Sequence, residues 1–174
     1  FGIPVLASIK GAADIVMDVH LMIEEPIRYV EAFHKAGADI LNVHYEACED
    51  LQATLDAIHK CGMKAGLTIK PATPVEVLKP YLDQAELFLI MSVEPGKGGQ
   101  SFIPESLDKI RELRGLLNEK GLTADVEVDG GIHLGNAKEV LESGANVLVA
   151  GSAVFKDNIA ENVKGFMEIL NENE

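Results

Sequence analysis

Apolar and polar positions follow a pattern that predicts strands and helices in regular alternation. Short, nearly continuous apolar runs are typical of buried parallel strands, and the longer stretches between them repeat every three or four residues, as helices do. The predicted strands are 15–21, 38–44, 63–69, 86–91, 126–129 and 146–150. The predicted helices are 4–10, 24–36, 49–60, 74–81, 104–119, 134–142 and 158–170. The pattern therefore predicts an α/β protein, with a parallel sheet covered by helices.

An internal repeat supports this architecture. Residues 35–43 (KAGADILNV) match residues 142–149 (ESGANVLV), and in both segments a glycine ends a helix shortly before a strand. Gly62 and Gly121 hold the same place before two other strands, and neighbouring units recur at 23 to 25 residues. Glycine is favoured there because helix ends commonly need a left-handed residue. Such a unit is typical of a doubly wound sheet or of a (β/α)₈ barrel.

The unusual polar residues lie where the predicted strands end. These ends carry His20, His44, Lys70, the glycine-rich segment 92–100, Asp129 with Gly130 and Gly131, and Gly151 with Ser152. In a barrel all six ends meet on one face, whereas in a doubly wound sheet only the ends at the switch point meet. The distribution favours the barrel. The glycines of the last two loops also match the phosphate site that barrels place after their last strands.

Composition and charge narrow the range of partners. The 174 residues, 47% of them hydrophobic and 25% charged, have the size and composition of one globular domain. A net charge of −13 argues against nucleic acid and anionic membranes as partners. A small phosphate ligand is compatible with this charge, because backbone N–H groups bind phosphate within acidic proteins. Two cysteines without metal-type spacing, and no visible leader segment, predict a cytoplasmic location.

Four motifs, taken in order, resemble the ribulose-phosphate 3-epimerase family. They are DVHLM at 18–22, MSVEPGKGGQSFIP at 91–104, VDGGI at 128–132 and AGSA at 150–153. The resemblance implies a (β/α)₈ TIM barrel of the ribulose-phosphate-binding type. It also implies an isomerase of the pentose phosphate pathway that interconverts D-ribulose 5-phosphate and D-xylulose 5-phosphate. The cofactor implied is a divalent metal ion, usually zinc or iron, with manganese or cobalt as alternatives.

The resemblance also implies roles for individual residues. Asp129 would be a catalytic acid/base and a metal ligand, His20 would be a second metal ligand next to the substrate, and Met22 would cap the reacting carbon. The residues that would hold the substrate and its phosphate are Gly96, Lys97, Gly98, Gly99, Gly130, Gly131, Gly151 and Ser152. Removing a proton beside a ketone needs a positioned base and a cation where negative charge develops. This set of residues therefore fits epimerisation at carbon 3.

Two departures from the family pattern matter. The family's first two β/α units precede the stretch that residues 1–2 match, and they carry a Ser, a His and an Asp that complete the site. We therefore expect residues 1–174 to be a single barrel domain that is N-terminally incomplete and belongs to a longer protein. The second departure is Lys97, where the family usually has Phe. This lysine either adds a cation near the phosphate or points to solvent.

Several alternatives are left open at this point. The chain could be a related epimerase of a hexulose phosphate, such as allulose 6-phosphate, or a truncated, inactive barrel that binds a sugar phosphate. A homo-oligomer is compatible with both. His44 either supports the site or is structural, Lys70 either attracts phosphate or is a solvated loop residue, and Glu46 lies near the predicted mouth without an assigned role.

Overall fold

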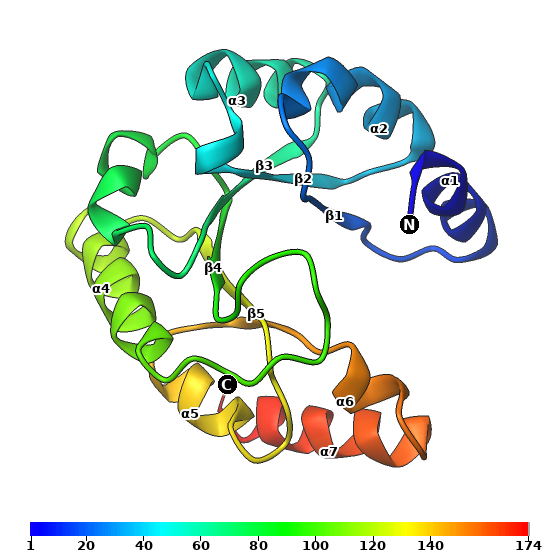
Figure 1. Cartoon of the computed structure of the whole chain (residues 1–174), viewed down its shortest axis with the longest axis vertical. Coiled ribbons are helices and arrows are strands. Elements are labelled where there is room, and N and C mark those ends of the chain that lie inside the picture. Colours follow the sequence, from blue (N-terminus) through cyan, green and yellow to red (C-terminus); the bar gives the residue numbers. More distant parts are fainter. Residues whose placement is uncertain (174) are drawn as a thin grey trace.

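A single sheet of six parallel strands forms the centre of the computed structural model, which describes residues 1–173 (Figure 1). The strands are β1 (Asp18–Leu21), β2 (Ile40–His44), β3 (Lys64–Ile69), β4 (Leu87–Met91), β5 (Asp125–Asp129) and β6 (Val147–Val149). They lie side by side in sequence order, and each pairs in parallel with the next. A doubly wound sheet reverses its strand order part-way across, so the observed order excludes that alternative.

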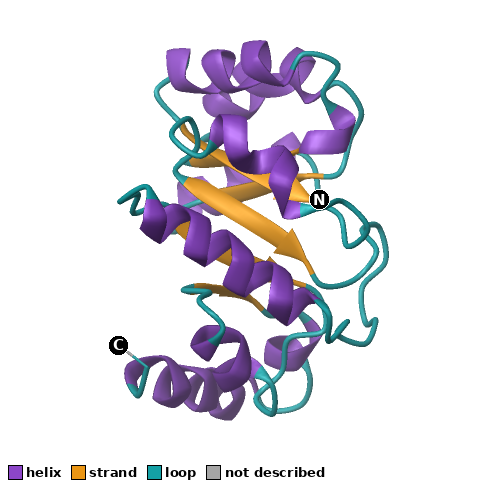
Figure 2. Cartoon of the chain, turned by 90° about the vertical axis from the view of Figure 1, so that its left-hand side faces the viewer, coloured by secondary structure: helices purple, strands orange, loops and turns teal. Residues whose placement is uncertain are grey.

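The helices lie on the outer side of the curled sheet (Figures 1 and 2). The first precedes β1 and the last two follow β6, whereas the others lie in the connections between strands. The α-helices are α1 (Ile3–Ala12), α2 (Val30–Ala36), α3 (Leu51–Lys60), α4 (Ser106–Glu119), α5 (Ala137–Glu142), α6 (Ser152–Phe155) and α7 (Ile159–Asn171). Three 3₁₀ helices complete the set: η1 (Pro26–Tyr29), η2 (Tyr45–Ala47) and η3 (Val75–Tyr81). Among residues 1–173, no helix has the length and apolar character needed to cross a membrane.

Together the strands and helices form a C-shaped half-barrel. Its opening lies between α1 and β1 on one side and α6 and α7 on the other (Figure 1). The sequence-based prediction of a barrel-type α/β fold is confirmed for these six strands. The closed (β/α)₈ barrel stays a prediction.

Four predicted elements differ clearly from the structure, and one of them, the helix predicted at 134–142, begins only at Ala137. The strand predicted at 15–21 begins only at Asp18. The helix predicted at 24–36 is divided into η1 and α2. The helix predicted at 74–81 is the 3₁₀ helix η3, which contains Pro80. Proline lacks an N–H group and clashes with the preceding turn, so a regular α-helix is not maintained there.

Polar side chains just before three strands fix the alignment of the sheet. Asp39, Glu86 and Asn146 each accept a backbone hydrogen bond from the neighbouring segment of the sheet. The donors, each at 2.7 Å, are the N–H groups of Met17, Ala65 and Val126. Two of these polar residues belong to the internal repeat, two positions after Gly37 and Gly144, whose φ angles of 98° and 114° end their helices. The repeat therefore specifies both where a helix ends and how the next strand aligns.

Apolar side chains pack on both faces of the sheet. The larger cluster lies between the sheet and the helices, and it includes the apolar face of α4, namely Leu107, Ile110, Leu113 and Leu117. A smaller cluster comes from β4 and the residue that follows it, and it consists of Leu87, Leu89, Met91 and Val93. Side chains alternate between the two faces along a strand, so the smaller cluster occupies the concave face.

A buried polar chain crosses the concave face beside the smaller cluster. Thr68 donates a hydrogen bond to Oδ1 of Asn42 at 2.7 Å, and Nδ2 of Asn42 donates to Oε2 of Glu127 at 3.0 Å. Each of the three residues is at most 4% exposed. Gly66 makes room for the chain, because a Cβ at this position would lie 2.6 Å from Cγ of Asn42. The contacts link β2, β3 and β5 inside the half-barrel.

Two carboxyl groups on this face, those of Glu127 and Asp18, hold their protons unusually tightly. Burial raises the pKa of Glu127 to about 8, with further upward contributions from the nearby carboxylates of Asp18 and Asp129. Burial likewise raises the pKa of Asp18 to about 6, although His20 and Glu127 act in the opposite direction. Glu127 is therefore a neutral, hydrogen-bonded group below about pH 8. Glu127 lies two residues before Asp129 in β5, and side chains two residues apart in a strand share a face. This spacing is the sequence signal that identifies Glu127 as inward-facing.

We expect the free energy of unfolding to fall as the pH rises from about 5 to about 8. Glu127 binds its proton more tightly in the folded protein, with a pKa of about 8 against the ordinary 4.5, so raising the pH through this window favours the unfolded chain. One such proton changes the free energy of unfolding by at most about 1.4 kcal/mol per pH unit.

The variant Glu127→Gln keeps a hydrogen-bond acceptor for Asn42 and cannot ionise, so its stability should depend less on pH over the same window. Urea denaturation of the metal-free protein at several pH values measures both curves. Equal losses of stability in the two proteins would contradict the assignment.

The turn after β5 depends on two glycines with left-handed backbone conformations. The φ angles of Gly130 and Gly131 are 128° and 64°. A Cβ on Gly131 would lie 2.3 Å from the backbone N of Phe102, and one on Gly130 would lie 2.6 Å from the side chain of Val93. The segment 92–102 therefore packs directly on this turn, which gives the two glycines a structural reason independent of any ligand.

Replacing Gly131 with alanine should lower the free energy of unfolding by at least about 1 kcal/mol, because both the backbone conformation and the contact with Phe102 oppose a side chain. Gly98→Ala is the matched control, since a Cβ there would meet no atom within 4 Å. We expect the control to change stability by less than about 0.5 kcal/mol. Chemical denaturation measures both variants, and equal stabilities would refute the proposed packing constraint.

Candidate active site

A cavity of about 610 Å³ lies at the carboxyl ends of the strands. Ten of the eleven residues that the sequence predicts for the site line it: Met22, Gly96, Lys97, Gly98, Gly99, Asp129, Gly130, Gly131, Gly151 and Ser152. The eleventh is His20, which contacts Asp129 at the cavity wall. The fold thus gathers residues from distant parts of the chain around one cavity. Their catalytic and binding roles stay predictions.

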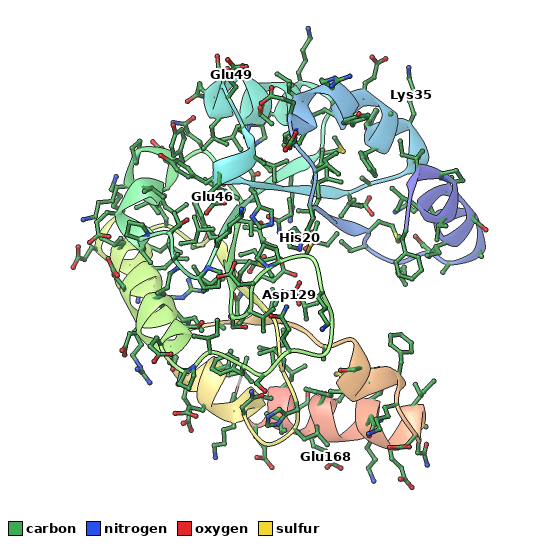
Figure 3. All side chains as sticks on the ribbon, in the orientation of Figure 1. His20, Lys35, Glu46, Glu49, Asp129 and Glu168 are labelled. Carbon is green, nitrogen blue, oxygen red and sulfur yellow. The ribbon has the colours of Figure 1, made fainter. Side chains whose placement is uncertain are left out.

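His20 and Asp129 approach each other from β1 and β5 on the inner side of the half-barrel (Figure 3). Nδ1 of His20 lies 3.6 Å from Oδ2 of Asp129, and the two side chains are 16% and 26% exposed. Two ligands of a tetrahedral zinc ion lie roughly 3.4 Å apart, given metal–ligand distances of about 2.0–2.2 Å. The pair therefore fits two positions around a divalent metal.

In the part of the chain that the structure describes, no third side chain joins His20 and Asp129 to complete such a metal site. Over residues 1–173, no group of three or more His, Cys, Asp or Glu side chains is placed to hold a metal ion together. A catalytic zinc site commonly uses three protein ligands and leaves one position for water or substrate. His20 and Asp129 thus amount to part of a coordination sphere.

Ser92 ties the end of β4 to the Asp129 turn. It is fully buried, and its N–H donates to the carbonyl oxygen of Asp129 at 2.9 Å. Its hydroxyl lies 3.0 Å from the same oxygen and 2.7 Å from the carbonyl oxygen of Gly130, and it donates to them. The sequence singles out Ser92 only as the first residue of a glycine-rich loop. Its buried position and its contacts show that it positions the strand end that carries Asp129.

The side chain of Gln100 holds the glycine-rich loop that follows in shape, through two hydrogen bonds to the backbone of the same loop. Nε2 of Gln100 donates to the carbonyl oxygens of Glu94 and Lys97 at 2.6 and 2.7 Å. Gly96 and Gly99 have φ angles of 112° and 74°, a conformation that favours glycine. Lys97 is exposed and lines the cavity, so both the phosphate contact and the solvent-facing alternative fit its position.

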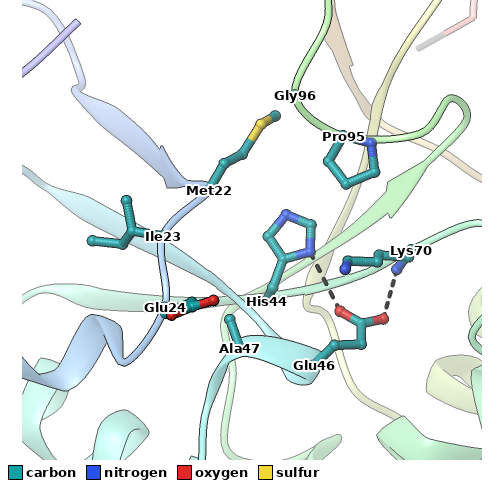
Figure 4. Close-up of a pocket in the computed structure, with 9 residues that line it drawn as sticks. All are labelled: Met22, Ile23, Glu24, His44, Glu46, Ala47, Lys70, Pro95 and Gly96. Atoms are coloured by element: carbon teal, nitrogen blue, oxygen red, sulfur yellow. Dashed lines mark hydrogen bonds and ion pairs between the residues drawn. The ribbon is translucent and has the colours of Figure 1, made fainter.

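Two smaller hollows continue the main cavity along the rim. One of about 330 Å³ shares Met22, Pro95 and Gly96 with it and extends toward β2 and β3 (Figure 4). Its other walls are Ile23, Glu24, His44, Glu46, Ala47 and Lys70. The second, of about 580 Å³, shares Ser152 and Gly131 and reaches His133. The rim therefore offers room on both sides of Asp129.

His44 lies against His20 at the ends of β1 and β2. Their Nε2 atoms are 2.8 Å apart, and the rings are stacked with centroids separated by 4.9 Å. His44 is only 3% exposed, and its Nδ1 lies 3.4 Å from Oε2 of Glu46. Of the two alternatives that the sequence leaves for His44, this geometry favours support of the site.

Glu46 is held in place from β3 and the turn that follows it. Its Oε1 accepts hydrogen bonds from the N–H of Lys70, at 2.9 Å, and from the hydroxyl of Thr73. Burial alone would raise the pKa of Glu46, but its contacts with His44, Lys70 and Thr73 outweigh burial and lower the pKa to about 2. Glu46 is therefore ionised at neutral pH. Its role depends on contacts between separate elements, which no local sequence pattern reveals.

Comparisons with known proteins agree with the motifs at the rim. A model of the ribulose-phosphate 3-epimerase family matches residues 1–155. The ribulose-phosphate 3-epimerase of Bacillus subtilis is 49% identical over 152 residues, which are 87% of this chain and 70% of that protein. The Synechocystis enzyme is 55% identical over 152 residues, which are 86% of this chain and 66% of that protein. The chloroplastic enzyme of Arabidopsis thaliana is 48% identical over 164 residues, which are 92% of this chain and 58% of that protein. The chain thus spans 58 to 70% of the length of these relatives.

Solved structures with the same architecture support the half-barrel. The 3-hexulose-6-phosphate synthase of Salmonella typhimurium superposes with a TM-score of 0.74 at 18% identity, covering 99% of this chain and 82% of that one. The orotidine 5'-phosphate decarboxylase of Pyrococcus horikoshii superposes with a TM-score of 0.68 at 16% identity, covering 98% of this chain and 81% of that one. At such low identity these structures show the fold alone. The family match over residues 1–155, together with relatives that share about half of the aligned residues, shows that the chain belongs to the ribulose-phosphate 3-epimerase family.

Proposed function

We propose that this chain is part of a metal-dependent isomerase that interconverts D-ribulose 5-phosphate and D-xylulose 5-phosphate by proton transfer at carbon 3. The observation that carries the proposal is the placement of Asp129 beside His20 at the wall of a cavity lined by glycine-rich loops. The names of the relatives favour the pentose phosphate over a hexulose phosphate such as allulose 6-phosphate. The chain spans 58 to 70% of the length of those relatives.

Asp129 is the proposed acid/base group on one face of the sugar. Its carboxylate is part-exposed toward the cavity, and Ser92 fixes the backbone that carries it. His20 and Asp129 together would hold a divalent metal, for which zinc or iron suits the imidazole and carboxylate ligands, and manganese or cobalt is an alternative. A bound metal supplies stabilisation of the negative charge that develops on substrate oxygens. Met22 lies across the same cavity and would cover the reacting carbon.

The glycines of the rim are the proposed phosphate contacts. A Cβ on Gly96, Gly98, Gly99 or Gly151 would meet no atom within 4 Å, so a ligand can approach this backbone closely. Gly130, Gly131 and Ser152 line the same cavity. Backbone N–H groups left uncovered by side chains are suited to bind a phosphate, and the ammonium group of Lys97 would add attraction in an otherwise acidic protein.

We propose a small sugar phosphate as the partner and the cytoplasm as the location. The net charge of −13 argues against nucleic acid and anionic membrane as partners. The free thiols of Cys48 and Cys61 fit a reducing compartment. A homo-oligomer is compatible with this assignment.

A chain that binds sugar phosphate without catalysing epimerisation is the second candidate. One observation favours it: across the described residues, His20 and Asp129 are not joined by a third side chain in a metal-binding group. In that case the cavity would bind the phosphate, and no proton at carbon 3 would exchange with solvent.

Solvent deuterium exchange separates the two candidates. A folded sample with added zinc or iron should incorporate deuterium at carbon 3 of D-ribulose 5-phosphate, as detected by proton NMR. Asp129→Asn should lower the exchange rate at least about 100-fold, because it removes the acid/base group, while affinity for inorganic phosphate stays within about threefold. Asp125→Asn at the opposite end of β5 removes the same charge and serves as the control.

Retained exchange in Asp129→Asn would overturn the role of Asp129. A folded, metal-loaded wild-type sample without exchange would instead exclude epimerase activity of the 174-residue chain and support the binding protein.

A further inference from the structure

We propose that Glu46 sets the tautomer of His20 through His44, and so keeps Nδ1 of His20 unprotonated and available to a divalent metal beside Asp129. The four side chains form a line across the rim from β5 through β1 and β2 to η2. Successive atoms in the line are 3.6, 2.8 and 3.4 Å apart. The metal in this inference rests on the proposed function, whereas the tautomers follow from the contacts alone.

The line begins at Glu46, which can only accept hydrogen bonds while it is ionised. The Lys70 N–H and the Thr73 hydroxyl hold Oε1, and the low pKa of about 2 keeps the carboxylate charged. Oε2 then faces Nδ1 of His44 at 3.4 Å (Figure 4). Figure 4 shows that the carboxylate of Glu46 contacts His44 through one oxygen and Lys70 through the other.

The charge of Glu46 determines which nitrogen of His44 carries the proton. Nδ1 of His44 is buried and has no hydrogen-bond partner of good geometry among the described residues, so the nearby carboxylate is the group that it faces. A protonated Nδ1 is attracted to that carboxylate, whereas a bare Nδ1 would set two lone pairs against each other. We therefore assign the proton of neutral His44 to Nδ1, which leaves Nε2 as an acceptor.

The tautomer of His44 fixes that of His20. The two Nε2 atoms are 2.8 Å apart, a distance that requires one of them to donate a hydrogen bond. If Nε2 of His44 accepts, Nε2 of His20 carries the proton. A neutral imidazole carries only one proton, so Nδ1 of His20 is left with its lone pair.

The result is a lone pair of His20 directed toward a carboxylate oxygen. Two such acceptors at 3.6 Å repel each other, but less strongly than a bare Nδ1 of His44 and Glu46 would, because that contact is shorter, at 3.4 Å, and more buried. A cation between His20 and Asp129 removes the repulsion, and the 3.6 Å spacing suits two ligands of one metal. The opposite tautomer would place a proton on Nδ1 of His20, which would bind Asp129 and block the metal. Glu46 is therefore a positioning residue, because it acts on the metal site through His44.

Nitrogen NMR of the histidine rings tests the tautomers directly. In metal-free wild-type protein at about pH 8, where histidine is ordinarily neutral, long-range proton–nitrogen correlations distinguish Nδ1–H from Nε2–H rings. We expect the proton on Nδ1 in His44 and on Nε2 in His20. The reverse assignment for either ring would overturn the proposal. The measurement needs neither metal nor activity, so its outcome is independent of whether the chain is an epimerase.

Glu46→Gln tests the link to the metal. Glutamine carries no charge and can turn an NH₂ group toward His44, so the reversed tautomers become accessible. We expect NMR to show loss of the wild-type tautomers, and the dissociation constant for zinc, measured by competition with a chelating dye, to rise about 10- to 100-fold.

Glu24→Gln is the matched control, because Glu24 lines the same hollow and loses the same charge. It should change zinc affinity by less than about twofold, and circular dichroism checks that both variants are folded. Equal losses of affinity in the two variants, or unchanged tautomers in Glu46→Gln, would contradict the proposed role of Glu46. If the wild type binds no zinc, the metal assignment in the proposed function fails, and the tautomers of wild type and Glu46→Gln still decide the inference.

Discussion

The parallel alignment of six strands is the constraint on which the rest of the structure depends. Because all strands run in one direction, their carboxyl ends reach the same rim, and residues far apart in the sequence meet there. Side chains reinforce the alignment at both ends of the sheet. Asp39, Glu86 and Asn146 bind neighbouring backbone where strands begin, and Ser92 joins two strands where they end. The geometry of the candidate site therefore follows from the register of the sheet.

Carboxyl groups on the concave side differ in protonation because their surroundings differ. Glu46 accepts hydrogen bonds that stabilise its charge, whereas Glu127 is buried beside other carboxylates and keeps its proton. Asp129 is part-exposed at the cavity wall. A carboxyl group can thus serve as an anchor, as a neutral part of the interior or as the proposed reacting group, according to its neighbours.

Much of the fold follows from the sequence, because it depends on local periodicity. Alternating strands and helices, with glycines such as Gly37 and Gly144 at helix ends, predict the parallel sheet and the rim where the site lies. The 3₁₀ form of η3 depends on Pro80, and a pattern of apolar spacing alone does not resolve it. The line of side chains from Glu46 through His44 to His20 cannot be predicted from the sequence, because it depends on distances between separate strands and on side-chain direction. The proposed roles of the rim residues rest on family resemblance together with their placement around one cavity.

The proposed function requires the strand ends at the rim to form one binding site for a sugar phosphate. Amide chemical shifts of the nitrogen-15-labelled chain, followed during titration with D-ribulose 5-phosphate, test it most directly. We expect the largest shifts at the amides of 96–99, 130–131 and 151–152, with smaller changes at His20 and Met22. Shifts centred on the outer helices, or no change at the rim in the presence of saturating sugar phosphate, would contradict it.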